Sequence, residues 1–410
     1  MSENGQRKTE NGSAPWYLPR PMAIARNVTD ALERASWIRR MFEAARKLEA
    51  ERGAAAVADL SLGNPCNEPP PEFFAHLAAE AKEKRPHRYM TNAGYPDVRA
   101  TFAKHIAART GLSYEADDIC LTVGAAGGLN VLLRALLDPG DDVVLVQPSF
   151  VEYPFYVENY GGVTCAVPPT DDFLPDPGRI ADACTATTRA VILNAPNNPT
   201  GRVYPERVLM DLGRALAGAS AKFSRPIYLI FDDPYRVLYY TPKPPPEAVR
   251  YYDQTLYVSS FSKDLGLAGE RIGYVAIHPG AADRADLRRA LPFAMRALGQ
   301  VNAPALMQRA AAALLHGERD DVRAFYRKRR DRVAAVLAET GLDHPPLEGA
   351  FYAFPRSPDA DDLVFCRRML DKGLVVVPGT AFGAPGRFRI SYAVDEAVLE
   401  RGLGMLRDAL

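Results

Sequence analysis

The stretch LYVSSFSKDLGLAGERIGYVAI, residues 256–277, contains two apolar runs of the kind that form buried strands, with a lysine between them. Lys263 follows the first run, has the hydroxyls of Ser260 and Ser262 beside it, and precedes Arg271 by eight residues. A lysine at the end of a buried strand, beside an arginine that binds anions, is suited to a Schiff base with an aldehyde cofactor that carries a phosphate. Taken alone, the segment also allows a second interpretation, a solvated lysine with a structural arginine.

Working outward from this stretch, short and almost uninterrupted apolar runs alternate with helical segments. Helical periodicity is clear at Leu129–Leu137 and Pro205–Ala217, which lie between such runs. The expected strands are Ile119–Val123, Val143–Val146, Ala190–Leu193, Tyr228–Phe231, Leu256–Ser259 and Gly273–Ile277. Strands of this kind, separated by helices, predict an α/β fold with a mostly parallel sheet that is covered on both faces.

The pattern changes after about residue 280, where long amphipathic helices precede short strands. We therefore expect a large α/β domain and a smaller α+β domain. An N-terminal helix, Thr29–Arg52, ends at Gly53 and belongs to a segment that joins the smaller domain. The expected divisions are a disordered polar tail (1–14), the N-terminal segment (15–64), the large domain (65–294) and the small domain (295–410).

Composition excludes several classes of protein. The 410 residues include 50 Lys plus Arg and 50 Asp plus Glu, so no global field would recruit nucleic acid or an anionic membrane. No run approaches the ~18 apolar residues of a membrane span, and the polar N-terminus lacks the apolar core of a signal peptide. Five scattered cysteines without a C-x-x-C pair, and six histidines without H-x-x-x-H, argue against disulfides and metal sites and favour the cytoplasm.

In sheets of this class, ligands bind outside the carboxyl ends of the strands, so the residues after each apolar run are the candidates. Gly124–Gly128 opens a helix with small residues, whose backbone N–H groups suit a phosphate, although an ordinary tight turn fits equally well. Phe150 and Tyr153 follow the next run, and an aromatic ring there is able to stack on a planar ligand or to belong to the core. Asn194–Gly201 forms a rigid, proline-rich loop that would hold the Asn198 amide as a donor to a phenolate-type oxygen.

Two further strand ends carry charged side chains. Asp232 is expected to be buried and to need a partner, which a protonated pyridine nitrogen would supply. Tyr235, three residues later, would reach a neighbouring ring oxygen. In the alternating run Arg387–Tyr392, one arginine should face inward, and Arg389 is a candidate clamp for an α-carboxylate, although the run alone fits an exposed strand arginine by default.

The ordered motifs NAPNNPTG, DDPY, SFSKDLGLAGERIGY and FRISY resemble those of class I/II, fold-type I pyridoxal-phosphate (PLP) aminotransferases, in particular the aspartate aminotransferase group. The resemblance is collinear from about Ser36 to the C-terminus. It implies the PLP-dependent transferase fold type I and a ping-pong transfer of an amino group between an α-amino acid and a 2-oxo acid. It also implies a homodimer with shared active sites.

The resemblance also implies roles for single residues. Lys263 would form the internal aldimine and move the proton between Cα and C4′, and Asp232 would pair with the pyridinium nitrogen. Arg389, Gly63 and Asn198 would bind the substrate. The remaining contacts to the cofactor would come from Asn198 and Tyr235 at the phenolic oxygen, Phe150 on the ring, and Ala125, Ala126, Ser260, Arg271 and the neighbouring subunit's Tyr89 at the phosphate.

Some alternatives stay open at this level. Ala125–Gly128 offers no polar side chain where relatives often place one, and Arg296 is a candidate second carboxylate ligand or a plain surface arginine. A PLP enzyme of β/γ-elimination, replacement or cyclisation would use the same scaffold. A non-catalytic PLP-binding regulator would need a DNA-binding module, for which the ~35 residues before the resemblance are too few.

Overall fold

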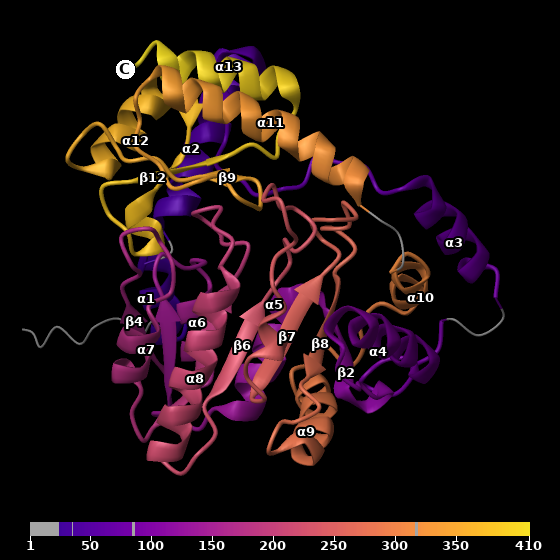
Figure 1. The fold of residues 1–410 in the computed structure, drawn as a ribbon. Helices are drawn as coiled ribbons and strands as arrows, with labels where there is room; N and C mark the ends of the chain where they lie inside the picture. Colours follow the sequence, from indigo (N-terminus) through magenta and orange to yellow (C-terminus); the bar gives the residue numbers. More distant parts are fainter. Residues whose placement is uncertain (1–23, 35, 84–86, 316–318) are drawn as a thin grey trace, which may run out of the picture.

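The segment that bears Lys263 connects two neighbouring strands of a seven-stranded sheet, which Figure 1 shows in the lower part of the molecule. The computed structural model describes residues 24–34, 36–83, 87–315 and 319–410. The strand order is β2-β8-β7-β6-β5-β3-β4. The strands are β2 (Ile119–Val123), β3 (Asp142–Val146), β4 (Val163–Val167), β5 (Thr188–Asn194), β6 (Tyr228–Asp232), β7 (Thr255–Ser260) and β8 (Ile272–Ile277).

The sheet is mostly parallel, as predicted, and the exception is β8, which runs antiparallel to both β2 and β7. All residues of β6, β7 and β8 are buried. Their side chains alternate between two cores: Tyr257 lies in one, and Leu256 and Val258 lie in the other. Both faces are therefore covered, which explains the continuous apolar runs.

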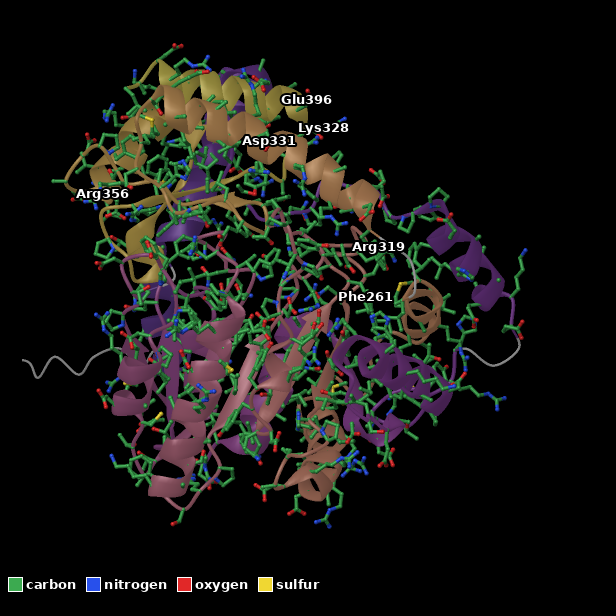
Figure 2. All side chains as sticks on the ribbon, viewed as in Figure 1. Phe261, Arg319, Lys328, Asp331, Arg356 and Glu396 are labelled. Carbon is green, nitrogen blue, oxygen red and sulfur yellow. The ribbon has the colours of Figure 1, made fainter. Side chains whose placement is uncertain are left out.

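Helices cover the two faces of the sheet, and side chains fill the space between them (Figure 2). The core that contains Tyr257 also receives α3 (Pro71–Ala81), α4 (Pro96–Thr110), α7 (Pro177–Ala183), α8 (Glu206–Lys222) and α10 (Ala305–Ala313). The opposite core receives α5 (Gly124–Leu136), α6 (Tyr153–Glu158) and α9 (Arg284–Ala297). Three short 3-10 helices, Ala116–Asp118, Ala248–Arg250 and Ala54–Ala56, complete this part and the N-terminal connection.

A separate core unites the N-terminal segment with the C-terminal part of the chain. Figure 1 shows these indigo, orange and yellow elements above the large sheet. The helices of this core are α2 (Ser36–Arg52), α11 (Asp320–Glu339), α12 (Asp362–Asp371) and α13 (Glu396–Arg407), and the 3-10 helix Gly379–Phe382 contacts α12. Helix α1 (Arg26–Arg34) precedes α2 and lies lower in Figure 1, with most of its described side chains exposed. The strands are β1 (Ala58–Asp59), β9 (Tyr352–Ala353), β10 (Leu374–Val375), β11 (Val377–Pro378) and β12 (Phe388–Ser391).

The cores on the two faces of the large sheet agree with an α/β part, and the separate core agrees with a smaller α+β part, while the boundaries at residues 65 and 295 stay predictions. Helix α10, beyond residue 295, contributes its buried residues to the core of the large sheet. The predicted tail 1–14 lies outside the described residues. The expected helix Thr29–Arg52 is instead described as two helices, α1 and α2, on either side of residue 35, while its predicted end before Gly53 is confirmed, and Gly53 has φ +85°. Within the described part of the chain, no helix is both long and apolar enough to cross a membrane.

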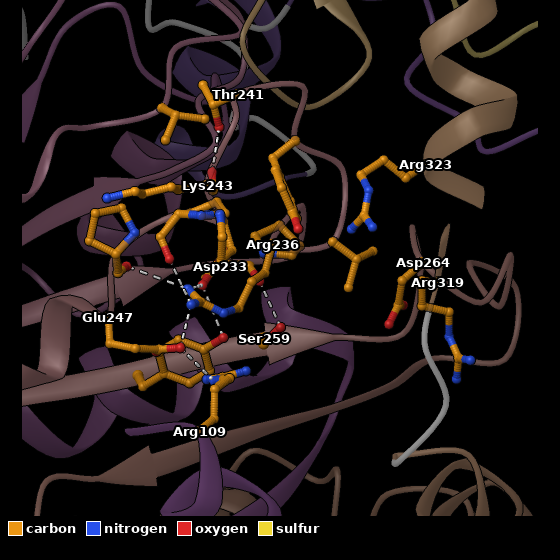
Figure 3. Close-up of a pocket in the computed structure, with 18 of the residues that line it drawn as sticks. Arg109, Asp233, Arg236, Thr241, Lys243, Glu247, Ser259, Asp264, Arg319 and Arg323 are labelled. Carbon is orange, nitrogen blue, oxygen red and sulfur yellow. Dashed lines mark hydrogen bonds and ion pairs between the residues drawn. The ribbon is translucent and has the colours of Figure 1, made fainter. Parts of the chain in front are cut away.

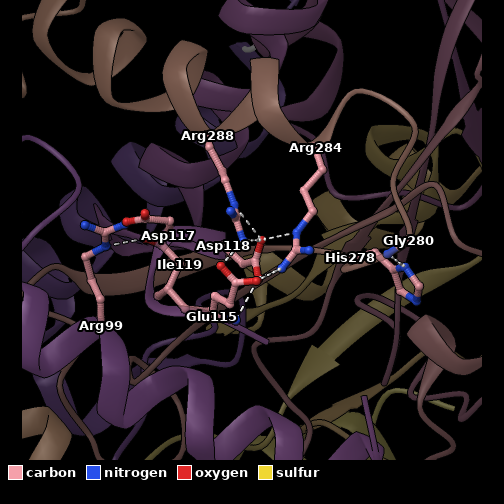
Figure 4. A network of polar contacts seen from close by, with 9 residues as sticks. All are labelled: Arg99, Glu115, Asp117, Asp118, Ile119, His278, Gly280, Arg284 and Arg288. Carbon is pink, nitrogen blue, oxygen red and sulfur yellow. Dashed lines mark hydrogen bonds and ion pairs between the residues drawn. The ribbon is translucent and has the colours of Figure 1, made fainter. Parts of the chain in front are cut away.

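An ionic cluster attaches α9 to the start of the sheet (Figure 4). Asp118, fully buried just before β2, accepts hydrogen bonds from Arg284 (2.6 and 2.7 Å) and Arg288 (3.0 Å). Burial favours a higher pKa for Asp118, but the hydrogen bonds from Arg284, the Glu115 backbone N–H and Arg288 outweigh it and hold the pKa below its usual value. The cluster therefore fixes α9 relative to β2.

Candidate active site

Lys263 lies beyond the end of β7 and is partly buried. Its Nζ donates a hydrogen bond to the carbonyl oxygen of Gly63 at 2.7 Å. Burial, followed by the positive charges of Arg271 and Arg389, lowers the pKa of Lys263 to about 8, and Asp232 opposes this shift. The amine is therefore easier to deprotonate than an ordinary lysine, as a nucleophile or a base requires.

Asp232 is the last residue of β6, one residue beyond the predicted end of that strand, and it is buried. Its Oδ2 accepts a 2.6 Å hydrogen bond from the hydroxyl of Tyr153. Its Oδ1 is buried and has no hydrogen-bond partner among the described residues. Burial raises the pKa of Asp232 to about 7, against the hydrogen bond from Tyr153 and the charge of Lys263, while Asp233 raises it further. This oxygen suits a protonated donor.

The start of α5 and the start of β8 form a second part of the site. The antiparallel register pairs Val123 with Ile272, so Arg271 lies beside Gly124. Gly124 has φ +68°, and a Cβ on it would lie 2.6 Å from Nη2 of Arg271. Helix α5 begins at Gly124, where the run of small residues was expected to open a helix, and its first N–H groups have no side-chain cap. Uncapped N–H groups beside an arginine suit an anion.

The remaining residues predicted for the phosphate lie at or near this position, with one exception. Ala125 and Ala126 open α5 and are partly buried, and Ser260 is buried at the end of β7. Tyr89 is 88% exposed, so within one chain it is free to contact a second copy. Its predicted contribution to a neighbouring site stays a prediction.

The NAPNNPTG loop is held by its own amides. The Asn194 side chain accepts a hydrogen bond from the backbone N–H of Asn198 (2.7 Å) and donates to the carbonyl of Asp232 (2.9 Å). Oδ1 of Asn198 accepts from Nη1 of Arg389 at 2.8 Å. This bond orients the amide nitrogen of Asn198 as a donor.

Arg389, on β12, is the arginine of the alternating run that faces inward. Arg387 instead pairs with Asp343 at 2.9 Å. The Arg389 guanidinium lies between the rings of Tyr352 and Phe382, at 4.6 and 4.8 Å from their centroids, and also donates to the carbonyl of Ser61. Its Nε is buried without a partner among the described residues, and burial lowers the pKa of Arg389. A buried guanidinium with spare donor capacity suits a carboxylate.

Tyr235 lies close to these groups, and the residue that it contacts was not predicted. Its hydroxyl is 2.9 Å from the hydroxyl of Tyr352 on β9. A Cβ on Gly63 would lie only 1.9 Å from the same Tyr352 hydroxyl, so only glycine fits there. The structure thus groups Gly63, Tyr235, Tyr352 and Arg389 in one place.

Two aromatic and cationic candidates have different surroundings. Phe150 is partly buried and packs edge-on against Tyr153, with centroids 5.5 Å apart, so it adjoins the partner of Asp232. Arg296 is exposed at the end of α9, where its guanidinium lies 5.5 Å from the Phe293 ring. That environment is typical of a surface arginine. Across the described residues, His, Cys, Asp and Glu side chains form no group of three or more that could hold a metal ion.

A cavity of about 1180 Å³ lies on the other face of the sheet (Figure 3). Asp233 faces it, because consecutive strand residues point to opposite faces. Arg236 contacts both Asp233 (3.1 Å) and Glu247, and Arg109 pairs with Glu247 at 2.9 Å. Lys263, Asp232 and Arg389 are not among the lining residues, but Ser260 is, so the cavity adjoins the candidate active site at the end of β7.

Comparison with known families and proteins gives a consistent result. The family model described as "Aminotransferase class I and II" matches residues 55–406. The chain is 33% identical over 374 residues to the probable aspartate/prephenate aminotransferase of Thermus aquaticus, with 89% of this chain and 94% of the relative covered. It is 34% identical over 370 residues to the aspartate/prephenate aminotransferase of Thermus thermophilus, with 88% and 92% covered.

Solved structures are similar over almost the whole chain. An amino transferase from Eubacterium rectale superposes with a TM-score of 0.89 at 33% identity, covering 95% of this chain and 98% of the other. The aspartate aminotransferase from Thermus thermophilus with maleate superposes with a TM-score of 0.84 at 29% identity, covering 95% and 100%. These similarities extend across both cores.

Proposed function

The chain belongs to the class I and II aminotransferases, which are PLP-dependent enzymes of fold type I, and from this premise we propose how its residues hold the cofactor and the substrate. An aminotransferase moves an amino group between an α-amino acid and a 2-oxo acid in two half-reactions. The relatives described above are named as aminotransferases, so elimination, replacement and cyclisation are not favoured.

The observation that carries the proposal is the unpartnered, buried Oδ1 of Asp232 beside Lys263. A carboxylate buried in this way requires a charged donor, and the protonated ring nitrogen of PLP is one. We propose that the N–H groups of Ala125 and Ala126, together with Arg271 and Ser260, bind the phosphate. Phe150 would stack on the ring, and Tyr235 and the Asn198 amide would donate to the phenolic oxygen.

When bound, PLP supplies a ring that withdraws electrons from the substrate Cα. Asp232 would hold the proton on the ring nitrogen. Lys263 would hold the cofactor, and its amine, whose pKa burial lowers to about 8 in the protein alone, would accept the proton from the substrate Cα. Arg389, oriented by Asn198, binds the α-carboxylate through a charged, paired contact, and Gly63 leaves room for it.

The substrates are proposed in part from the relatives. The Thermus enzymes are named aspartate/prephenate aminotransferases, so L-aspartate is the first donor to test and prephenate the first acceptor. Residues 125–128 carry no side chain for a second carboxylate, so the donor panel should also include amino acids with neutral side chains.

We also propose a homodimer and a cytoplasmic location. The dimer is supported by the 88% exposure of Tyr89, which the family resemblance assigns to the neighbouring site. Light scattering that returns the mass of a single 44.9 kDa chain would contradict it. The location is supported by five cysteines that are all unpaired, as expected in a reducing compartment, and cell fractionation would test it.

The proposal is tested by adding single amino acids to the PLP-loaded protein while the visible absorption of the bound cofactor is recorded. We expect at least one donor to convert the visible band, and Lys263→Ala to lack both the band and the conversion. Arg389→Lys should raise the KM of that donor about tenfold to hundredfold, since a paired, charged contact is worth roughly 1.5–3 kcal/mol.

Arg387→Lys is the matched control, because Arg387 lies two residues away, just before the same strand, and pairs with Asp343 instead. A wild-type protein whose band no amino acid converts would exclude transamination. Equal effects of the two arginine substitutions would exclude Arg389 as the clamp.

A further inference from the structure

Tyr352 is fully buried on β9 and contacts three parts of the candidate site at once. Its hydroxyl lies 2.9 Å from that of Tyr235, and its ring faces the Arg389 guanidinium at 4.6 Å. The same hydroxyl occupies the space beside Gly63, whose carbonyl accepts from Lys263. Tyr352 belongs to the core of the C-terminal part, so it reaches from that core into the site on the large sheet.

We propose that Tyr352 is a positioning residue with two separable parts: its hydroxyl sets the hydrogen bond that Tyr235 donates to the cofactor, and its ring holds Arg389 in place for the substrate carboxylate. This inference rests on the roles proposed above for Tyr235 and Arg389. It extends them, because neither role requires a second tyrosine.

The role of the Tyr352 hydroxyl follows from which of the two tyrosine hydroxyls has a proton to donate. Burial raises the pKa of both tyrosines, so each hydroxyl keeps its single proton at neutral pH. If Tyr235 donates its proton to an anionic oxygen of the cofactor, the 2.9 Å contact requires Tyr352 to donate to Tyr235. Successive donors polarise one another, so the Tyr352 proton strengthens the donation by Tyr235.

The ring part follows from the surroundings of Arg389. The guanidinium lies between the faces of Tyr352 and Phe382, and its Nη atoms are held by Asn198 and the Ser61 carbonyl. A desolvated cation on an aromatic face is stabilised appreciably, and two rings restrict it to one plane. Removal of either ring should therefore loosen the clamp without changing its charge.

The hydroxyl part is tested on PLP-loaded protein without substrate, by titrating the visible absorption of the cofactor against pH. Loss of a donor makes the cofactor's phenolic oxygen hold a proton more tightly, so Tyr352→Phe should raise the midpoint by about half a pH unit. Tyr240→Phe is the matched control, since it removes another buried tyrosine hydroxyl bond, to the Ala350 carbonyl, in the same core. The control should leave the midpoint within about 0.1 unit of the wild-type value.

The ring part is tested with the amino donor that the wild-type protein uses best in the panel above. Tyr352→Leu and Phe382→Leu should each raise the KM of that donor about tenfold, with a smaller change in kcat, while Tyr352→Phe should change KM less than about twofold. Tyr352→Leu should also shift the spectral midpoint, and Phe382→Leu should not.

Equal midpoints for wild-type and Tyr352→Phe would overturn the hydroxyl part, and an unchanged KM in Tyr352→Leu would overturn the ring part. Circular dichroism and unfolding midpoints of the apoproteins identify a variant that fails to fold. If Tyr352→Leu does so, Tyr352→Phe decides the hydroxyl part and Phe382→Leu decides the ring part, which an unchanged KM would overturn. If the wild-type protein itself shows no visible band or no donor, the proposed function fails, and this is distinguishable because the failure precedes any substitution.

Discussion

At the scale of single residues, the site depends on buried groups that each lack one partner. Among the residues that the structure describes, Oδ1 of Asp232 has no hydrogen-bond partner while Tyr153 binds Oδ2, and Nε of Arg389 has none while its Nη atoms are bound. Such atoms cost stability in the protein alone, and a ligand that pairs with them recovers that cost. The free energy of unfolding of the protein without cofactor should therefore be lowered by these unpaired atoms.

Asp232 provides a test that depends on pH. Its pKa of about 7 in the folded protein, against a usual value near 3.8, means that the folded state keeps a proton that the unfolded state has lost between these values. Stability of the apoprotein should thus fall as pH rises from about 4 to 7. Asp232→Asn should remove this pH dependence. Relative to wild type, its free energy of unfolding should therefore increase by about 1–3 kcal/mol as the pH is raised from 5 to 8, which urea unfolding measures.

Asp171→Asn, an exposed aspartate, is the control and should follow the wild-type curve. Added PLP should stabilise the wild-type apoprotein more than Asp232→Asn at pH 8. Parallel curves for wild type and Asp232→Asn, with equal stabilisation by PLP, would contradict the role of this carboxylate.

At the scale of elements, the ends of strands and helices place the reactive groups, and the sequence predicted much of this. The apolar runs before Asp232 and Lys263 were confirmed as β6 and β7, and α2 ends before Gly53. Strand β4 was missed because it lies at the sheet edge, and four of its five residues are not buried. Helix α5 begins at Gly124, where the run of small residues was expected to open a helix, although glycine and alanine carry no apolar periodicity.

Helix α9 depends on one buried carboxylate for its attachment to the sheet. Asp118→Ala should leave Arg284 and Arg288 without their partner and lower the free energy of unfolding by about 3 kcal/mol. Asp286→Ala, in the same helix, removes an exposed pair with Arg289 and should cost less than about 0.5 kcal/mol. Urea unfolding of both variants measures the difference.

Because the pKa of Asp118 lies below its usual value, its contribution is present at neutral pH and is lost as pH falls through the folded-state pKa. The difference in free energy of unfolding between Asp118→Ala and Asp286→Ala should therefore become smaller at acidic pH. Equal free energies of unfolding of the two variants at pH 7 would show that the cluster does not attach α9 to the sheet.

At the scale of the whole molecule, the site joins two cores. Exposed polar residues such as Lys328, Asp331 and Glu396 point outward from the upper helices (Figure 2), while Tyr352 and Arg389 reach inward to the large sheet. The motifs near Lys263 and Asn198 were visible in the sequence because the local strand ends carry them. The role of Tyr352 was not visible in the sequence, because its contact with Tyr235 joins residues 117 positions apart and no local pattern indicates it.

The same reason explains Tyr153, which the sequence suggested only as an aromatic able to stack on a ligand. Its hydroxyl instead contacts Asp232, 79 positions away. Sequence patterns indicate which residues end a strand, but long-range pairing decides which of them share a hydrogen bond. The roles of Tyr89 and of the predicted phosphate ligands stay predictions for that reason.

The central claim is that the amine of Lys263 carries the cofactor. The most direct measurement is reduction of the PLP-loaded protein with borohydride, followed by proteolysis and mass spectrometry of the peptide that contains residue 263. The account predicts a single phosphopyridoxyl adduct on Lys263 and none in Lys263→Ala. An unmodified Lys263 peptide from fully loaded protein, or an adduct on another lysine, would contradict it.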